Sequence, residues 1–334
     1  MSLRSGLILG VMCLLALLAA PSAGAAPGWL SPVTVSVSEE GHEVGEPRIA
    51  VDGQGDAIAV WHSEDGKLEG GVSSYEVQTA FRPAGGAWQI PERLSPYGQS
   101  AEDANVGFDG RGDMFAVWDA YNANVPRGDA HFSVQAAFRP VGGAWQAPVD
   151  LSPVEAPGGE YPSLAVDGQG DAMVSWDRGA GSVQEAFRPA GGAWQAPVEL
   201  TQGKEEGNFS KVAFDKQGDA LVTWLGGGGL QSAFMPAGGM WQPYATVGSE
   251  FVAGSDFAMN GRGDAVAVWA SWTEGFLSHR VVQASFRPPG GEWQAPVNLS
   301  EELHGEEWRW GLEPHEPRVA IDEQGDAVVV WSLE

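Results

Sequence analysis

The stretch PRIAVDGQGDAIAVW, residues 47–61, decides the fold because it recurs along the chain. In each copy an apolar segment leads into an Asp-x-x-Gly-Asp turn and a second apolar segment that ends in Trp. From the first Asp of the turn to that Trp is always nine residues, as from Asp52 to Trp61. Asn260 replaces the Asp in the fifth copy. The further copies lie at 104–118, 162–176, 210–224, 255–269 and 317–331.

A second motif follows the first, with the sequence VQTAFRPAGGAWQIPERLS at 77–95. It returns at 134–152, 183–201, 230–247 and 282–300. Its Val-Gln-x-Ala-Phe segment alternates as a half-buried strand does, and Pro-Ala-Gly-Gly is a turn signal. We expect a further strand to start at Ala-Trp-Gln. Each repeat unit is therefore predicted to be two β-hairpins, with glycines in the turns that supply positive φ.

Four short strands per unit, repeated without a helical segment, predict an all-β fold, a six-bladed β-propeller of four-stranded antiparallel blades. A strand at 28–37, which contains Gly28-Trp29, would complete the last blade and close the ring. The third strand of that blade has no counterpart in the sequence. The blade units are 47–95, 104–152, 162–201, 210–247, 255–300, and 317–333 together with 28–37.

Residues 1–26 have the order of a secretory signal peptide. Arg4 precedes an apolar run from Leu7 to Ala20, and Ala23-Gly24-Ala25 offers a small-residue cleavage site. The run is too short to span a bilayer comfortably. We therefore expect a secreted, extracellular protein in which the propeller occupies residues 27–334, without membrane insertion.

The composition excludes several classes of partner. The chain has 18 Lys and Arg against 44 Asp and Glu, a net charge of −26. This charge argues against binding to nucleic acid or to an anionic membrane surface. The single Cys, Cys13, lies in the predicted signal peptide, so a disulfide framework and a multi-Cys zinc site are excluded.

The residues of the repeat are predicted to be structural. Two repeat positions carry Trp, and these rings could stack on sugars, but packing between blades is the expectation. The Asp-x-x-Gly-Asp turns could be mistaken for calcium loops. Their middle residue is Gln or Arg, as at Gln54 and Arg111, and an Arg would repel a cation, so Asx turns are expected.

This order of strands and turns resembles the repeats of sialidase-like β-propellers, whose second hairpin carries the Asp-box Ser-x-Asp-x-Gly-x-Thr-Trp. The sequence keeps the Gly and Trp of that motif, as at Gly85 and Trp88, but has Phe81 and Pro83 where the Ser and Asp would fall. The Asp-boxes are thus degenerate. The resemblance covers about residues 29–333 and implies a propeller fold.

The turns of one propeller face repeat, whereas the loops of the other face vary, and variable loops on a rigid scaffold carry binding. All six His and three further Trp fall on the variable face. The loop at 300–317 combines acids, His and Trp, and three interpretations stay open: a carbohydrate site, a divalent cation site such as calcium, or a solvated acidic loop. The ligand-binding candidates are Trp272, His304, Glu306, Glu307, Trp308, Trp310 and His315.

The resemblance also implies an enzymatic alternative, sialidase-like glycoside hydrolysis, which in the family uses three Arg, a Tyr–Glu nucleophile pair and an acidic Asp. Arg48 and Arg318 share one repeat position, at the start of a blade's first strand. Arg280 or Arg309 could be the third Arg. The Tyr candidates are Tyr75, Tyr121 and Tyr161. No full catalytic constellation is readable.

We therefore predict a secreted, monomeric, non-enzymatic binding module that recognises a glycan or an extracellular protein through its variable loops. The alternative is a sialidase-like glycoside hydrolase. No cofactor is predicted, and no residue set is assigned to a metal beyond the calcium interpretation of the acidic loop.

Overall fold

The computed structural model describes residues 31–36, 43–67, 73–121, 132–152, 158–179, 181–201, 207–248, 252–272, 280–300 and 313–333. The chain divides into two compact units, Met1–Thr34 and Val35–Glu334, and every strand described lies in the second. Among the described residues there is no helix, and so none long and apolar enough to cross a membrane. The predicted signal peptide lies outside the described residues.

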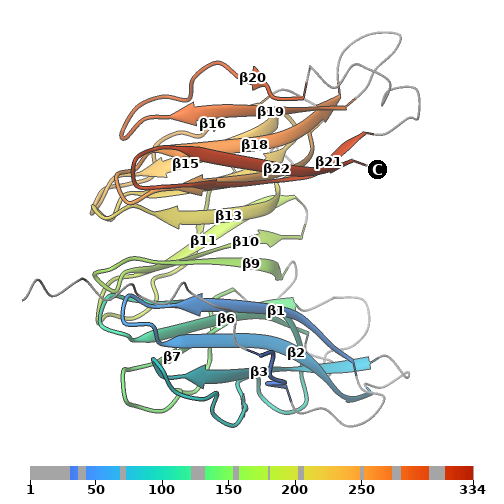
Figure 1. Ribbon diagram of the computed structural model, residues 1–334, viewed down its shortest axis with the longest axis vertical. Helices are drawn as coiled ribbons and strands as arrows, with labels where there is room; N and C mark the ends of the chain where they lie inside the picture. Colours follow the sequence, from blue (N-terminus) through green and yellow to red (C-terminus); the bar gives the residue numbers. More distant parts are fainter. Residues whose placement is uncertain are drawn as a thin grey trace, which may run out of the picture. The chain divides into compact units, whose positions relative to one another are not determined.

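The strands form five four-stranded antiparallel sheets and one two-stranded sheet (Figure 1). The first sheet contains β1 (Val44–Val51), β2 (Ala57–Lys67), β3 (Ser73–Arg82) and β4 (Glu92–Arg93). The second contains β5 (Ser100–Phe108), β6 (Met114–Tyr121), β7 (Phe132–Arg139) and β8 (Val149–Asp150). The third contains β9 (Gly159–Val166), β10 (Ala172–Arg178), β11 (Ser182–Arg188) and β12 (Val198–Glu199).

The fourth sheet contains β13 (Asn208–Phe214), β14 (Ala220–Gly226), β15 (Gly229–Met235) and β16 (Ala245–Thr246). The fifth contains β17 (Val252–Met259), β18 (Ala265–Trp272), β19 (Arg280–Arg287) and β20 (Val297–Asn298). The sixth consists of β21 (Pro314–Ile321) and β22 (Ala327–Leu333). Within each sheet the strands pair in chain order, as the two-hairpin repeat predicts.

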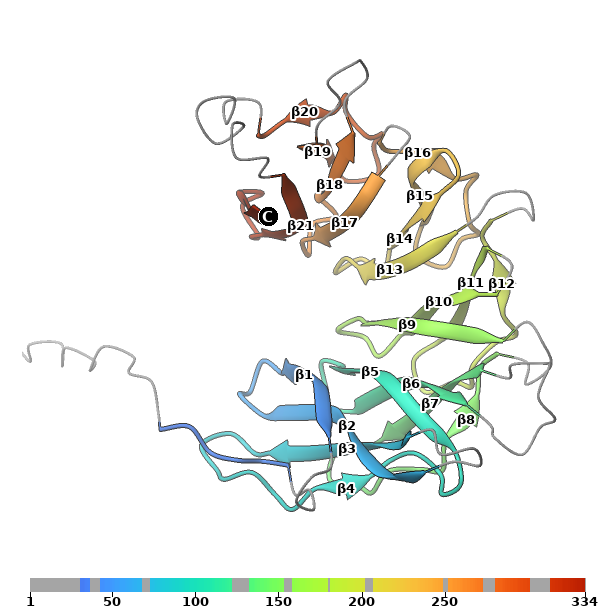
Figure 2. The same cartoon turned by 90° about the vertical axis from the view of Figure 1, so that its right-hand side faces the viewer.

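Successive sheets pack against one another through their first strands: β1 on β5, β5 on β9, β9 on β13, β13 on β17 and β17 on β21 (Figure 2). The apolar cores lie between neighbouring sheets. One core, for example, joins Val60 and Val77 of the first sheet to Trp118 of the second. Trp118, Trp176, Trp224 and Trp269 are fully buried in these cores, which confirms the packing role of these four repeat Trp.

One expectation about the second hairpin is wrong. The fourth strand of the first sheet starts at Glu92 and has two residues, rather than starting at Ala87-Trp88-Gln89. Gln89 donates one backbone hydrogen bond to Phe81 at 2.8 Å, but Pro91 has no N–H to continue the ladder.

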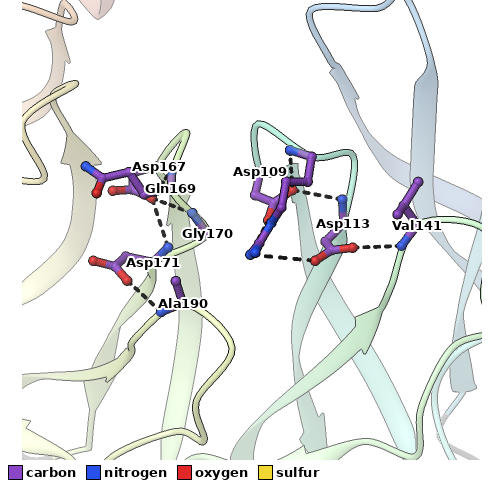
Figure 3. A network of polar contacts seen from close by, with 9 residues as sticks. Asp109, Asp113, Val141, Asp167, Gln169, Gly170, Asp171 and Ala190 are labelled. Carbon is purple, nitrogen blue, oxygen red and sulfur yellow. Dashed lines mark hydrogen bonds and ion pairs between the residues drawn. The ribbon is translucent and has the colours of Figure 1, made fainter.

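The Asp-x-x-Gly-Asp turns are Asx turns, as predicted. Asp109 Oδ1 accepts the backbone N–H groups of Arg111 at 2.8 Å and Asp113 at 2.9 Å. Asp113 Oδ1 in turn accepts the N–H of Val141 at 2.7 Å, which ties the first hairpin of the sheet to its second (Figure 3). Asp167 and Asp171 repeat the arrangement in the third sheet (Figure 3). The carboxylates of these turns therefore accept hydrogen bonds from backbone N–H groups.

The closed six-bladed ring is a finer prediction than the structure supports. Ile49 and Val51 of β1 are 63% and 62% exposed, and Val328 and Val330 of β22 are 68% and 58% exposed. Of the predicted closing strand at 28–37, residues 31–36 are described and lie outside any strand. Completion of the sixth blade by the N-terminus stays a prediction.

Candidate functional site on the bulge face

A β-bulge with an unusual backbone interrupts the first strand of five of the six sheets. In each, two residues of the first strand oppose the repeat Trp of the second, so that Glu46 and Pro47, for example, oppose Trp61. The first residue of each bulge has φ between 45° and 56°, a conformation that is strained for side chains other than Gly, Asn and Asp. These five bulge residues are Glu46, Asp103, Tyr161, Phe209 and Glu316.

The bulge residues lie at the ends of the first strands opposite the Asx turns, on the face predicted to carry the variable loops. We call this the bulge face. In the fifth sheet the register shift falls instead between Val252 and Gly254. Bulges commonly re-aim a side chain next to a functional site, so five of them at one repeat position mark this face for attention.

Buried carboxylates hold two of the bulges from the neighbouring sheet. Asp177 follows the repeat Trp of β10, and its carboxylate accepts the N–H groups of Phe209 at 2.5 Å and Ser210 at 3.1 Å in β13. Asp119 has the same place in β6 and accepts the N–H of Tyr161 in β9 at 3.4 Å. Both carboxylates are buried, so the backbone at Tyr161 and Phe209 is fixed by the sheet before it.

Tyr161 and Phe209 form an exposed aromatic pair that bridges the third and fourth sheets. Their ring centroids are 6.2 Å apart with the planes inclined by 36°. The residues are 50% and 61% exposed. Two aromatic residues that are held in strained backbone and remain at least half exposed are poorly explained by packing alone.

Next to the aromatic pair lies a set of carboxyl side chains, which we call the acidic group. Its members are Glu46, Glu102, Asp103, Asp119 and Glu160. Glu46 and Asp103 are the bulge residues of adjacent sheets, whose first strands β1 and β5 pack together. Burial, followed by the Glu46 carboxyl, raises the pKa of Asp103 to about 6. Burial, with the nearby Asp103, raises the pKa of Asp119 to about 8.

His62 lies at the edge of the acidic group. It follows the repeat Trp of β2, in the place that Asp119 and Asp177 take in their sheets, and it is 8% exposed. Its Nδ1 has no hydrogen-bond partner and lies 3.8 Å from Glu46 Oε2. The sequence placed the six His on the variable face; His62 and His315 lie in strands β2 and β21, beside the bulges at Glu46 and Glu316.

Tyr75, a candidate nucleophile, lies beside His62, with ring centroids 4.9 Å apart. Its hydroxyl donates to Glu43 Oε2 at 3.3 Å, so the structure contains one Tyr–Glu pair. Burial and the Glu43 charge raise the pKa of Tyr75, which disfavours the phenolate. Tyr121, at the end of β6, packs against Phe132 with ring centroids 5.3 Å apart.

The three candidate arginines have different partners. Arg48 and Arg318 lie two residues after their bulges, and each donates to the carbonyl of its preceding Pro, at 3.4 and 3.1 Å. Arg280 stacks on Trp272 at 4.8 Å from the ring centroid. Within the described residues, these bonds show no shared partner for the three guanidinium groups.

Three of the predicted residues do come together across the fifth and sixth sheets. Arg280 of β19 stacks on Trp272 of β18, lies 2.7 Å from His315 Nδ1 of β21, and is 3.5 Å from Glu313 Oε2. The Arg280 guanidinium therefore already has partners within the protein. The remaining candidates, His304, Glu306, Glu307, Trp308 and Trp310, lie outside the described residues.

Sequence reasoning missed Phe209 and the capping carboxylates Asp119 and Asp177. One signal was available: the bulge residue is always six residues before the first Asp of the turn, and Pro follows it in three copies, at Pro47, Pro162 and Pro317. Pro disfavours a right-handed helical backbone in the residue before it. For metals, the described ranges contain no group of three His, Cys, Asp or Glu that could hold an ion. The calcium prediction for 300–317 is untested.

Comparison with known proteins identifies the fold. No protein-family model matches the chain, and no curated protein matches its sequence. Among solved structures, the BP39L lectin from Burkholderia pseudomallei matches with a TM-score of 0.52 and 13% identity over 85% of this chain and 91% of the lectin. The NanB sialidase from Streptococcus pneumoniae matches with a TM-score of 0.52 and 8% identity, over 86% of this chain and 65% of that one.

The intramolecular trans-sialidase from Ruminococcus gnavus matches with a TM-score of 0.50 and 10% identity, over 86% of this chain and 90% of the enzyme. At such low sequence identity, these matches show the fold alone. The predicted resemblance to sialidase-like β-propellers is confirmed at that level.

Proposed function

We propose that this protein is an exported carbohydrate-binding propeller whose binding site is the bulge face, centred on Tyr161 and Phe209. The observation that carries the proposal is the exposed aromatic pair itself. Aromatic rings that stay in water offer the apolar faces of a sugar ring a stacking surface. Carboxylates beside them supply acceptors for sugar hydroxyls, the usual combination of a few polar groups with an apolar base.

The strain at the site supports a binding role over a packing role. A Tyr and a Phe in the left-handed region each cost free energy that Gly or Asn would avoid. The structure holds these residues there with buried carboxylates from the neighbouring sheet. Strained residues that the surrounding structure holds in place cluster at ligand sites.

The solved neighbours support the same reading at a coarser level. One is a lectin, one is a sialidase and one is an intramolecular trans-sialidase, so this fold is found both in a lectin and in enzymes of sugar chemistry. Export would bring such a module into contact with extracellular glycans, in agreement with the predicted signal peptide.

A glycan array tests the proposal. The full chain is expressed, and the secreted protein is applied to the array with and without calcium. Tyr161→Asn combined with Phe209→Asn should abolish the binding found for the natural protein, since Asn accepts the left-handed backbone but offers no ring. Tyr97→Ala is the matched control, because Tyr97 is 87% exposed and stacks on Arg93 of the outer strand β4. A blank array for the natural protein would overturn the glycan assignment.

The Tyr75–Glu43 hydrogen bond favours a second candidate function, glycoside hydrolysis with Tyr75 as nucleophile. Release of a fluorogenic aglycone from a sialoside by the natural protein, and no release by the Tyr75→Phe variant, would support hydrolysis. The raised pKa of Tyr75 and the separate partners of Arg48, Arg280 and Arg318 count against it. Binding is therefore the function we put first.

We further propose that the ring closes with six blades. The exposed apolar residues of β1 and β22 hold the repeat positions that pack together between the fifth and sixth sheets, where Val266 and Val268 meet Val319 and Ile321. Joining the two exposed faces would place the first and last blades side by side and make the bulge face continuous.

A further inference from the structure

We propose that the glycan recognised at the bulge face carries protonated amines, as hexosamine polymers do, with the sugar ring on the aromatic pair and an amine at the acidic group. This inference rests on the proposed function and specifies its ligand.

The order of the bulge residues places the two halves of such a site next to each other. Glu46, Asp103, Tyr161 and Phe209 come from four successive sheets, so two acids are followed by two aromatic rings. The two rings contact each other. The halves also meet, because Asp119 of the acidic group accepts the backbone N–H of Tyr161 at 3.4 Å, and Glu160 directly precedes Tyr161 in β9.

Negative charge at the acidic group exceeds the positive charge that the described residues bring to it. Arg48 lowers the pKa of Asp103, whereas Glu46 and Glu102 raise it. Burial is the largest cause that raises the pKa of Glu102 and of Asp103, and the charge of Glu46 adds to it in both. An added cation would relieve this repulsion, whereas an anionic sugar would increase it.

A second observation, independent of the acids, indicates an unfilled polar position. The His62 side chain is 9% exposed and its Nδ1, without a hydrogen-bond partner, lies beside the Glu46 carboxylate. A buried ring nitrogen is costly to leave unpaired. A ligand with hydroxyl or amine groups at Glu46 could supply the missing partner.

Ring stacking and charge together select the ligand class. A neutral sugar would use the rings but leave the carboxylates uncompensated, and a basic peptide would use the carboxylates without a flat apolar face for both rings. A protonated amino sugar satisfies both halves, because its amine is attached directly to the ring that stacks.

Three β-1,4-linked hexamers that differ only at C2 make the test: glucosamine with an amine, N-acetylglucosamine with an acetamide, and glucose with a hydroxyl. Isothermal titration of the exported protein with each hexamer should give the glucosamine hexamer about tenfold the affinity of the other two. The titration is run near neutral pH, where Asp103, with a pKa of about 6, is ionised and part of the amine is protonated. That preference should shrink as salt is added, because partly exposed charges are screened.

Substitutions then locate the effect. Glu46→Gln with Asp103→Asn should remove the preference for the amine while leaving the aromatic pair, and Asn is well tolerated at the positive φ of position 103. Glu92→Gln is the matched control, because it removes an exposed carboxylate from the outer strand β4 of the first sheet. The control should keep the preference.

The outcomes separate this inference from the proposed function. Equal binding of the three hexamers, or tighter binding of an uncharged one, overturns the amine while sugar binding stands. If none of the three hexamers binds although the glycan array is positive, the amine is likewise overturned while sugar binding stands. Failure of all three beside a blank array overturns both.

Discussion

The carboxylate of Asp177 in β10 accepts a 2.5 Å hydrogen bond from the backbone N–H of Phe209 in β13, so the third sheet sets the backbone from which an exposed ring of the fourth projects. The same carboxylate accepts the N–H of Ser210 at 3.1 Å. A carboxylate of one sheet thus determines where a proposed binding residue of the next sheet lies.

Asp177→Ala is expected to destabilise the protein by about 2–3 kcal/mol, because the N–H groups of Phe209 and Ser210 lose the buried carboxylate that accepts them. Sugar binding should weaken too, as the Phe209 ring loses its fixed position. Urea unfolding and titration of the array-identified sugar measure the two effects. Glu199→Ala, in the outer strand of the same sheet, should cost about 0.5 kcal/mol or less. An Asp177 variant as stable as this control would contradict the capping role.

Replacing the aromatic pair should separate stability from binding. Tyr161→Asn and Phe209→Asn relieve the left-handed strain and remove rings that are at least half exposed, so each should stabilise the fold by about 1 kcal/mol. Binding should be lost in the same proteins. Thermal unfolding decides the matter: a lower melting temperature would identify the rings as packing groups and remove the main support for the site.

The protein should be more stable in mild acid than in mild alkali. Burial raises the pKa of Asp119 to about 8, of Glu185 to about 7 and of Asp177 to about 6. The folded state therefore binds protons that the unfolded chain, with carboxyl pKa values near 4, has already released. Stability is full below about pH 4 for these groups and is lost as the pH rises toward 8.

The measurement is the urea midpoint of unfolding between about pH 5 and about pH 8. The free energy of unfolding derived from it should fall by about 1 kcal/mol or more over this range. Asp119→Asn should flatten the curve, since an amide needs no proton to stay neutral. A midpoint that rises with pH would show that the carboxyls are ionised at no cost, contrary to their burial.

Closure of the ring can be tested with cysteines, because Cys13 lies in the predicted signal peptide. Val51→Cys with Val328→Cys occupies the repeat positions held by Ile321 and Val266 in the core between the fifth and sixth sheets. A closed ring predicts a disulfide in the oxidised monomer. Ile321→Cys with Val266→Cys is the positive control. Cross-linking in the control alone would mean that the first and sixth sheets stay apart.

Local sequence determined most of the fold. The two hairpins, their turns and the buried Trp repeat with the chain, so spacing alone predicts them, and the Asx role of Asp109 follows from its turn. The bulges are harder to predict, since Glu46, Tyr161 and Phe209 share a position but no chemistry. The pairing of Asp177 with Phe209 depends on packing between sheets, which a single repeat does not encode.

For the candidate site too, the sequence predicted some residues, and others emerged only from packing and register. Composition directed attention to the loop Trp and His, and the structure does join Trp272 to Arg280 and His315. The sequence offers Tyr161 as a candidate nucleophile because it is a Tyr on the variable face, whereas no feature of the sequence marks its partner Phe209. Register, which shifts at the bulge, turned that residue toward solvent.

The position of the bulge opposite the repeat Trp has an evolutionary consequence. Each blade keeps its core with the Trp and its turn with the two Asp, so the bulge residue is free to vary without disturbing either. Glu, Asp, Tyr and Phe already occupy equivalent places in four neighbouring blades. Duplication of such a unit copies an adjustable contact along with its scaffold, and new ligand preferences can then arise one blade at a time.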